Sequence, residues 1–564
     1  MNTRKTLLGA LAVLIGLVFS SFKDDDRNFQ ISKNLDILNA VFKELDMFYV
    51  DTVDVEKTIQ YVINGMLALT DPYTEYFPDD DKGSLKELLT GKYGGIGSLI
   101  RYSKRHDRIV IAEPTEGMPA AMAGLKAGDV ILSVGGKEMV RGTMEPQEFS
   151  SKVSEALRGE PGTSFVLKVC RPLKNDSTVM EFKITRKSIK SNPVPYYGMV
   201  ADSIGYLYLT GFPEDCAKAV KKAFIDLKQQ GVKALIFDLR DNGGGSLQEA
   251  VEIVNLFVPK GQEIVTTKGK LRQASSSYKT SNEPLDTEIP LAILVNGNSA
   301  SAAEITSGSL QDLDRAVIIG ERTFGKGLVQ TTRNLPYNST LKVTTSKYYI
   351  PSGRCIQAID YAKKNADGTA ARIPDSLTTV FHTAAGREVR DGGGIRPDIE
   401  VKADKFPNIL FYLISEDIIF DYATQYCLEH PDMPIIDSLK ISDADYAEFK
   451  KLVKSRNFTY DRQSEKLLKT LKEFAEFEGY LEGASEEFKA LEKKLNHNLD
   501  RDLDYFAKDI KESIAEEIAP RYFYQKGAVM QRLKGDKNLE KAIEVLNSPA
   551  EYKKILSAPV ADKK

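Results

Sequence analysis

Apolar residues recur at every third or fourth position near both ends of the chain. In the N-terminal part this spacing is clearest from Leu35 and Leu38 onward, and beyond residue 398 it returns in segments rich in Lys and Glu. A period of about 3.6 residues places an apolar stripe on one face of a helix. The pattern predicts a helical domain over residues 23–90 and a helical region over residues 405–564. Ordinary packing helices are favoured over a coiled coil at the C-terminus, because no heptad repeat is sustained.

Two other patterns fill the middle of the chain. Short runs of β-forming residues separated by glycines follow Gly91, which is typical of a compact β domain. From about Gly205, apolar strands alternate with amphipathic helical segments, which predicts an α/β sheet with helical crossovers. We therefore expect a multidomain α+β protein with a β domain at residues 91–188 and an α/β core at residues 189–404. The expected strands include residues 108–112, 129–134, 164–169, 234–237 and 291–295.

The composition is that of an ordinary globular protein. With 564 residues the chain exceeds a single hydrophobic core, so several domains are expected. Hydrophobic residues make up 42% and charged residues 28%, and the net charge is -3 without long runs of like charge. A nucleic-acid-binding protein would carry a basic patch or stripe. We therefore expect no nucleic-acid partner.

Residues 1–22 have the pattern of a secretory signal peptide. Arg4 and Lys5 precede an apolar stretch over residues 7–19, and Ser20 and Ser21 follow it. The stretch is shorter than the roughly 20 residues of a membrane span. A clear A-x-A cleavage site is missing, so an uncleaved membrane anchor stays open as the alternative. We expect an exported, periplasmic protein, with membrane association through the N-terminus if the segment is retained.

The cysteines and histidines do not predict a metal site. The four cysteines lie far apart without a C-x-x-C pair, which favours buried free thiols over a disulfide. None of the four histidines has the spacing of metal ligands. No metal and no cofactor is therefore expected.

A candidate nucleophile lies where a buried strand gives way to a helix. Ser301 is flanked by Ala300 and Ala302, which would let a substrate backbone approach closely. The first turn of a helix offers unpaired backbone N–H groups that suit a developing oxyanion. The alternative is structural, because Ser301 and Glu304 have the spacing of a capping box.

Lys326 is the candidate base. A serine hydroxyl needs a base within hydrogen-bond reach, and no histidine lies in the region that carries Ser301. A buried lysine has a lowered pKa and so can be neutral. The neighbours Phe324 and Leu328 could supply an apolar wall, and Gln330 could orient the amine.

Three other strings carry weaker signals than this pair. Residues 320–327 nearly match a P-loop, but Gly327 replaces the Ser or Thr that binds magnesium. Residues 276–279 match S-x-x-K, without the further motifs of penicillin-recognising enzymes. The glycine run at residues 243–245 could expose amides at the sheet's edge, and its alternative is a flexible turn.

The order of these strings resembles that of the carboxyl-terminal processing peptidases, also called tail-specific proteases. The resemblance covers about 160 residues and rests on motifs in the same order. The motifs are Asp238-Leu-Arg-Asp-Asn-Gly-Gly-Gly245, Asn296-Gly-Asn-Ser-Ala-Ser301, Gln311-Asp-Leu-Asp-Arg315, Thr323-Phe-Gly-Lys326-Gly-Leu-Val-Gln330, Pro351-Ser-Gly-Arg354-Cys-Ile-Gln357 and Gly392-Gly-Gly-Ile-Arg-Pro397-Asp398.

This resemblance implies a crotonase-like α/β core and assigns roles within it. Ser301 would be the nucleophile, Lys326 the general base and Gln330 the residue that holds the lysine. The oxyanion hole would be formed by the backbone amides of Ala302 and of one glycine of the pair Gly243 and Gly244. The family commonly has a third serine where this chain has Ala303, a departure that leaves the nucleophile in place.

The β domain resembles the PDZ modules of the same family. Residues 93–97 are similar to the loop that binds a terminal carboxylate, so the amides of Gly95, Ile96 and Gly97 would hold the end of a polypeptide. Ser98 and Leu99 would begin the strand that pairs with the bound peptide. The alternative is a β domain that only packs.

Together these features predict an exported serine endopeptidase that captures polypeptide C-termini. Its partners would be unfolded or tagged proteins and peptides with free C-termini, and the sequence leaves an oligomer open. The main alternative is a catalytically inactive PDZ scaffold that binds protein tails. No function is assigned to residues 405–564.

Overall fold

The computed structural model describes residues 3–79, 87, 91–174, 176–365, 367–403, 405–433, 435–495 and 498–557, and the side chains only from residue 26 onward. The chain divides into two compact units. One comprises Met1–Phe77 with Thr332–Thr344, and the other Pro78–Thr331 with Thr345–Lys564.

The smaller unit contains two helices and a short strand. Helix α1 spans Thr3–Phe48, α2 spans Val55–Leu67, and strand β1, Glu75–Phe77, pairs antiparallel with β18, Thr340–Tyr349. The strand departs from the helical prediction for residues 23–90, because its pairing partner comes from a distant part of the chain. Leu35 and Leu38, which set the helical period, are 59% and 42% exposed.

The predicted signal segment, residues 1–22, lies outside the residues whose side chains are described. Among the helices of the described part, none combines the length and apolar character that crossing a membrane requires.

The β domain is an antiparallel sheet with two helices. Its sheet has the order β3-β4-β5-β7-β8, β6 pairs with β5, and β2 pairs separately with β9. Helix α5 packs Phe149 and Val153 into a core that includes Ile109, Ile111 and Ile131. The elements are β2 (Lys92–Gly95), β3 (Ser98–Ser103), β4 (Arg108–Pro114), α4 (Pro119–Met122), β5 (Val130–Val134), β6 (Lys137–Glu138), α5 (Pro146–Leu157), β7 (Ser164–Pro172), β8 (Ser177–Thr185) and β9 (Lys187–Lys190).

The α/β core is built on a six-stranded sheet of order β10-β11-β12-β15-β16-β23. Strands β11 to β23 run parallel and β10 pairs antiparallel with β11. All five residues of β12 and of β15 are buried, as expected for parallel strands covered on both faces. The strands are β10 (Tyr196–Ala201), β11 (Ile204–Tyr208), β12 (Ala234–Asp238), β15 (Leu291–Val295), β16 (Val317–Gly320) and β23 (Ile399–Glu400).

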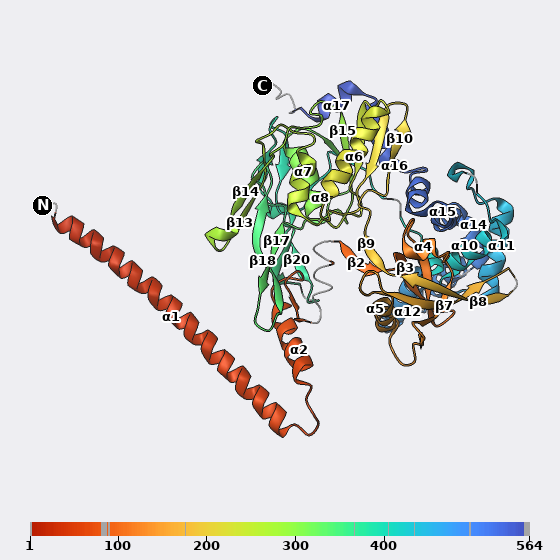
Figure 1. The fold of residues 1–564 in the computed structure, drawn as a ribbon, viewed down its shortest axis with the longest axis horizontal. Helices are drawn as coiled ribbons and strands as arrows, with labels where there is room; N and C mark the ends of the chain where they lie inside the picture. Colours follow the sequence, from red (N-terminus) through yellow and green to blue (C-terminus); the bar gives the residue numbers. More distant parts are fainter. Residues whose placement is uncertain are drawn as a thin grey trace. The chain divides into compact units, whose positions relative to one another are not determined.

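Different parts of the chain cover the two faces of this sheet. On one face Leu235 and Ile293 pack against α6 (Cys216–Gln229), α7 (Leu247–Val254) and α8 (Ala302–Asp312). Figure 1 labels these three helices beside the sheet. On the other face Ile236 and Leu294 pack against α16, Lys537–Leu546, from the C-terminal region. The last helices of the chain therefore complete the core of the α/β sheet.

A second sheet and two hairpins flank the core. Strand β13 (Glu263–Gly269) pairs antiparallel with β14 (Ser276–Lys279) and with residues 346–349 of β18. Strand β17 spans Leu328–Asn334. The hairpins are β19 (Ile359–Lys364) with β20 (Ala370–Arg372) and β21 (Val380–His382) with β22 (Glu388–Arg390).

The C-terminal region is helical, and its amphipathic pattern packs a core of its own. Leu503, Ile510, Ile514 and Ile518 are fully buried in it. Its helices are α9 (Asn408–Ser415), α10 (Ile418–Glu429), α11 (Asp443–Ser455), α12 (Gln463–Phe477), α13 (Ser485–Leu495), α14 (Leu499–Tyr505), α15 (Ala507–Arg532), α16 and α17 (Pro549–Ile555).

This region also packs against the β domain. Phe420 of α10 is buried against Val110 and Val130. The guanidinium groups of Arg101 and Arg521 lie 4.7 and 4.6 Å from the centre of its ring. The helical region thus covers the part of the outer face of the β-domain sheet around Val110 and Val130.

All four cysteines are free thiols. Only Cys216 is buried, and Cys170, Cys355 and Cys427 are half-buried, so the prediction of burial is wrong for three of them.

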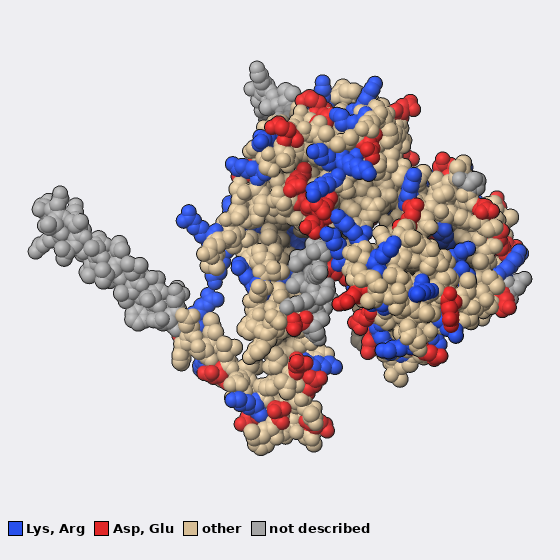
Figure 2. Space-filling view, in the orientation of Figure 1, with Lys and Arg blue, Asp and Glu red and all other residues tan. Residues whose placement is uncertain are grey.

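Basic and acidic side chains are intermixed on the face of the molecule shown in Figure 2.

Candidate active site

Ser301 occupies a strained turn between β15 and α8. Its φ and ψ are 56° and -114°, whereas a residue that only caps a helix is usually extended. A positive φ is costly for a residue with a Cβ, and such strain clusters at functional sites. The turn leads directly into α8, whose first residue, Ala302, has no intrahelical acceptor for its N–H.

Glu304 is the centre of the site. Its side chain is fully buried, and its Oε2 accepts hydrogen bonds from the backbone N–H of Ser301 at 2.8 Å and of Lys326 at 2.9 Å. Its Oε1 accepts from Gly325 N–H at 2.7 Å and from the Thr323 hydroxyl at 2.5 Å. Burial raises the pKa of Glu304 to about 7, against the opposing effect of these four donors. One carboxylate therefore ties the serine turn to the lysine loop.

A second tie comes from Tyr348 of β18, whose side chain is 1% exposed. Its hydroxyl lies 2.5 Å from the carbonyl oxygen of Lys326 and 3.1 Å from that of Ser301. Ser301 and Lys326 are therefore connected twice, through the carboxylate of Glu304 and through the hydroxyl of Tyr348.

The glycines beside Lys326 are required by close packing. A Cβ at Gly325, where φ is +90°, would lie 2.3 Å from the Cβ of Ala358, and one at Gly327 would lie 2.8 Å from Gln357 N. Lys326 is half-buried between them, and Leu328 of the predicted apolar wall is buried. Gln330 follows on β17 and is half-buried.

The glycine loop after β12 lies against the serine turn. A Cβ at Gly244 would lie 2.9 Å from the backbone nitrogen of Ala302, and its φ is +94°. Gly244 N–H donates to the side chain of Asn242 at 2.9 Å, while Gly243 N–H has no acceptor among the described residues. Asn242 also accepts from Ala300 N–H through its carbonyl at 2.9 Å. The loop therefore brings its amides beside that of Ala302.

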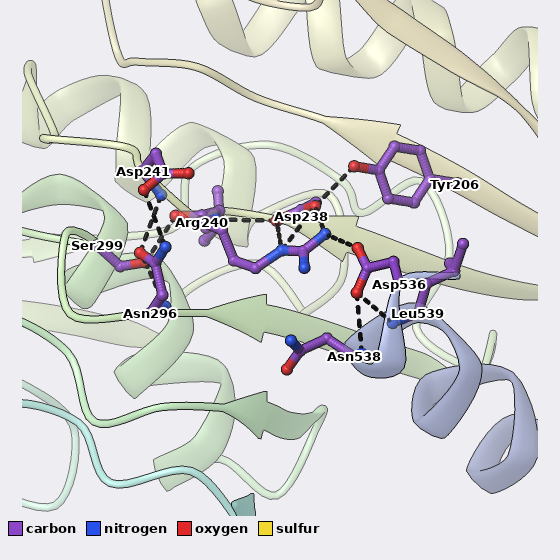
Figure 3. Close-up of polar contacts among 10 residues, drawn as sticks. Tyr206, Asp238, Arg240, Asp241, Asn296, Ser299, Asp536, Asn538 and Leu539 are labelled. Atoms are coloured by element: carbon purple, nitrogen blue, oxygen red, sulfur yellow. Dashed lines mark hydrogen bonds and ion pairs between the residues drawn. The ribbon is translucent and has the colours of Figure 1, made fainter. Parts of the chain in front are cut away.

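The start of this loop is fixed by a charged cluster (Figure 3). Asp238, 1% exposed, accepts from the Tyr206 hydroxyl at 2.6 Å and from the guanidinium of Arg240 at 2.6 Å. Asp241 accepts from the side-chain amides of Asn296 and Asn298, both at 2.9 Å. The glycine loop and the serine turn are thus hydrogen-bonded to each other along their length.

The predicted peptide-binding residues lie at one edge of the β domain. Gly95 ends β2, Ile96 is 3% exposed, and Gly97 has a φ of +66°. Ser98 and Leu99 begin β3, which is the terminal strand of its sheet and pairs only with β4 among the described strands. An unpaired edge of this kind can accept an added strand.

Neither competing motif has the local structure that its chemistry needs. The P-loop-like string is followed by strand β17, whereas a P-loop precedes a helix. Residues 276–279 form strand β14, in which residues three apart point to opposite faces.

Sequence reasoning missed three contributors to this arrangement. It assigned Glu304 only to a helix cap, and it did not single out Tyr348. It also gave no role to Asp536, whose Oδ2 accepts a hydrogen bond from Arg240 at 2.6 Å. Glu304 lies between Ala303 and Ile305, and a glutamate between apolar residues was the one available signal, because a buried carboxylate needs several donors.

Three family models match separate parts of the chain. Residues 203–363 match peptidase family S41, residues 110–171 match the PDZ domain, and residues 409–546 match the C-terminal helical domain of a probable PDZ-protease. The chain is 34% identical to a probable CtpA-like serine protease of Staphylococcus aureus over 355 residues, which are 62% of this chain and 68% of that protein. It is 35% identical to a carboxy-terminal-processing protease of Bartonella bacilliformis over 331 residues, 58% and 73% of the two chains.

Among solved structures, the photosystem II D1 C-terminal processing protease is similar over 65% of this chain and 87% of its own, with 27% identity and a TM-score of 0.36. The alignments with the two sequence relatives cover more than two thirds of each relative's length, and both relatives are named as proteases, as the match to peptidase family S41 predicts. The chain therefore belongs to peptidase family S41, the serine proteases related to the carboxy-terminal-processing proteases, and it carries a PDZ domain.

Proposed function

We propose that this protein is an exported serine endopeptidase that captures polypeptide C-termini through its PDZ domain and cleaves peptide bonds with Ser301 and Lys326. The observation that carries the proposal is the shared carboxylate of Glu304, which ties the backbones of both residues at one point. A purely structural serine cap would need no such link to a lysine loop.

In the proposed reaction, neutral Lys326 takes the proton of the Ser301 hydroxyl as the serine oxygen attacks the peptide carbonyl. The resulting tetrahedral oxyanion is stabilised by backbone N–H groups. Collapse of this intermediate breaks the peptide C–N bond, and Lys326 returns the proton to the leaving amine. Water then attacks the acyl-enzyme by the same route and releases Ser301. Gln330 is proposed to hold the lysine side chain.

The proposed oxyanion donors are Ala302 N–H and one amide of the pair Gly243 and Gly244. Ala302 supports the assignment because it begins a helix directly after the nucleophile. In the observed conformation Gly243 is the glycine whose amide lacks an acceptor among the described residues, since Asn242 accepts from Gly244. We therefore assign the second donor to Gly243 in this conformation.

The PDZ domain would bind the substrate's terminal carboxylate with the amides of Gly95, Ile96 and Gly97. The peptide would then pair with the open edge of β3 from Ser98 and Leu99 onward. Main-chain hydrogen bonds make this recognition tolerant of sequence, which suits substrates that share only a free C-terminus.

We further propose a crotonase-like fold for the catalytic core and a periplasmic or otherwise exported location. The fold proposal rests on the family resemblance together with the parallel sheet covered by helices. The location rests on the basic residues Arg4 and Lys5 followed by an apolar stretch. Fractionation of cells that produce the protein, with a cytoplasmic and a periplasmic marker, tests the location.

Cleavage of an unfolded protein tests the activity. Parent, Ser301→Ala and Lys326→Ala proteins are incubated with a denatured polypeptide, and the products are followed by gel electrophoresis. Fragments are expected from the parent alone, with all three proteins equally folded by circular dichroism. A parent that binds tails without producing fragments would instead indicate the inactive scaffold, and full activity of either variant would refute the assigned residues.

A further inference from the structure

One contact joins the C-terminal helical region to the loop that carries the oxyanion glycines. Nη2 of Arg240 donates to Oδ2 of Asp238 and to Oδ2 of Asp536, each at 2.6 Å (Figure 3). Arg240 is therefore held between a carboxylate at the end of its own strand and a carboxylate that lies almost 300 positions further along the chain. The Asp536 side chain is 7% exposed and that of Arg240 is 15% exposed, so solvent screens this pair only weakly.

The other carboxylate oxygen fixes Asp536 itself. Oδ1 accepts hydrogen bonds from the backbone N–H groups of Asn538 at 2.9 Å and Leu539 at 3.2 Å, so Asp536 caps the N-terminus of α16. Helix α16 in turn packs on the core sheet through Ala542 and Val545, both fully buried. The carboxylate that reaches Arg240 is thus attached to a helix that cannot shift without opening the core.

From these contacts we infer that Asp536 is a positioning residue for the oxyanion loop, supplied to the peptidase by its C-terminal helical region. The inference rests on the proposed function, because it assigns to Asp536 an effect on the amides that stabilise the oxyanion. Asp536 would not touch the substrate, and it would act only through Arg240.

Other hydrogen bonds of the loop come from within the α/β core. Asp241 is held by Asn296 and Asn298, and the Asn242 side chain donates to the carbonyl of Leu209 at 2.7 Å. Arg240, three positions before Gly243, is the loop residue that binds Asp536 of the helical region. Releasing it from one side leaves the loop attached and lets its amides deviate from the position that an oxyanion requires.

The size of the expected effect follows from what an oxyanion donor contributes. Complete removal of one donor lowers kcat by about 10²–10³-fold in a well-studied serine protease. A donor that is displaced rather than removed should cost less, so we expect about a ten-fold loss of kcat. Substrate binding by the PDZ domain is separate from this loop, so KM should change by less than about two-fold.

Asp536→Ser separates positioning from helix capping. Serine is as good an N-cap as aspartate, but its side chain is too short to bridge to Arg240. The matched control is Ser442→Ala, which removes the N-cap of α11 in the same helical region. Each protein is assayed for kcat, KM, thermal unfolding and inhibition by a peptidyl boronate, whose tetrahedral adduct with serine places an anionic oxygen in the oxyanion hole.

The inference predicts that Asp536→Ser lowers kcat about ten-fold and weakens boronate inhibition in parallel, with KM nearly unchanged and the unfolding temperature lowered by the loss of a largely buried ion pair. Ser442→Ala should lower the unfolding temperature and leave kcat and boronate inhibition at the parent values. Asp536→Asn keeps one oxygen for the helix cap and places an NH₂ group opposite Arg240, so it should lose kcat as Asp536→Ser does.

Arg240→Lys provides a second, independent check. The double variant Arg240→Lys, Asp536→Ser should lose little more activity than Arg240→Lys alone, because the shorter lysine side chain does not bridge both carboxylates and Asp536→Ser breaks the same bridge. Additive losses would overturn the inference, as would parent-like kcat and boronate inhibition in Asp536→Ser. The proposed function is tested separately by Ser301→Ala in the same assay: an inactive Ser301→Ala beside an unaffected Asp536→Ser rejects only the positioning role, whereas an active Ser301→Ala rejects the proposed function.

Discussion

Ser301 and Lys326 donate their backbone N–H groups to the same atom, Oε2 of Glu304, at 2.8 and 2.9 Å. The two residues are 25 positions apart in the sequence and lie on separate loops. Because both N–H groups bind one fully buried carboxylate, the distance between the two loops depends on the side chain of Glu304. Changes at Glu304 should therefore affect catalysis before they affect substrate binding.

Glu304→Gln is expected to lower kcat at least ten-fold with little change in KM. Glutamine replaces one acceptor oxygen by an NH₂ group, so two of the four donors around Glu304 lose their partner. An unsatisfied buried donor costs about 1–3 kcal/mol, so a clear loss of stability should accompany the loss of rate. Steady-state kinetics and urea unfolding measure both effects. The control is Glu283→Gln at an exposed position, and parent-like kinetics in Glu304→Gln would show that the carboxylate does not organise the site.

Glu304 should also make stability depend on pH. Its pKa is raised by burial to about 7, whereas the usual value is 4.5. The folded protein then binds the proton more tightly than the unfolded chain, so this contribution is fully present below pH 4.5 and is lost as the pH rises through 7. A tenfold difference in proton affinity corresponds to about 1.4 kcal/mol, so the contribution is roughly 3 kcal/mol. Urea unfolding at pH 5 and pH 8 should show the parent losing stability relative to Glu304→Gln as the pH rises, and a difference that does not vary with pH would contradict the raised pKa.

Activity should change with pH in the opposite direction. Protonated Glu304 cannot accept all four of its hydrogen bonds, so the tie between the two loops weakens as the pH falls below about 7. Protonation of the proposed base acts in the same direction. We expect kcat to fall on the acidic side while the contribution of Glu304 to stability grows. A pH profile of kcat that stays flat between pH 5 and 8 would be incompatible with both effects.

Tyr348→Phe should reduce kcat several-fold and leave the core intact. The substitution removes the hydroxyl that lies near the carbonyl oxygens of Lys326 and Ser301 and keeps the buried ring. Loss of one hydrogen-bonding group costs about 1 kcal/mol of stability. Tyr349→Phe on the neighbouring position of β18 is the matched control and should behave as the parent in thermal unfolding and in kinetics. Equal effects of the two substitutions would remove Tyr348 from the site.

Gly243 and Gly244, the two glycines of the proposed oxyanion loop, should differ sharply in whether they tolerate alanine. Gly244→Ala places a Cβ 2.7 Å from the carbonyl oxygen of Ala300 at a φ of +94°, so it should disrupt the site and lower kcat at least 100-fold. A Cβ at Gly243 meets no atom within 4 Å, so Gly243→Ala should keep the unfolding temperature of the parent. Thermal unfolding of both variants compares them directly, and a tolerated Gly244→Ala would contradict the close approach of the loop to Ala302.

Peptides with a free and an amidated C-terminus test the proposed PDZ site. The amides of Gly95, Ile96 and Gly97 should bind a carboxylate more strongly than a neutral amide, because charge-assisted hydrogen bonds are about twice as strong. We expect at least ten-fold weaker binding of the amidated peptide by calorimetry with the Ser301→Ala protein. Equal affinities would mean that the β domain does not recognise the chain end.

The local patterns of the sequence were sufficient for much of the fold. The alternation of strands and helices predicted β12 and β15 almost to the residue, because buried parallel strands are continuous apolar runs. The strand at β1 was missed, since three residues acquire strand geometry only by pairing with β18. The place of α16 on the core sheet was missed for the same reason, because an amphipathic pattern shows that a face is buried and not which surface covers it.

In the candidate site, too, local features could be predicted from the sequence and contacts between distant residues could not. Ser301 and Lys326 could be proposed as candidates from their neighbours, because a strand-to-helix turn and flanking glycines are local features. Glu304, Tyr348 and Asp536 act across distances of up to hundreds of residues in the sequence, and their roles depend on which donors meet them in the folded chain. No local pattern distinguishes a buried carboxylate that organises two loops from one that caps a helix.

The most direct test of the account is to locate the covalent bond. The parent and Lys326→Ala proteins are mixed with an activated peptidyl ester, quenched with acid within a turnover and digested, and the adduct is mapped by mass spectrometry. We expect the acyl group on Ser301 in the parent and no adduct above background in Lys326→Ala. An acyl group on another residue, or parent-level acylation of Ser301 without Lys326, would contradict the proposed mechanism.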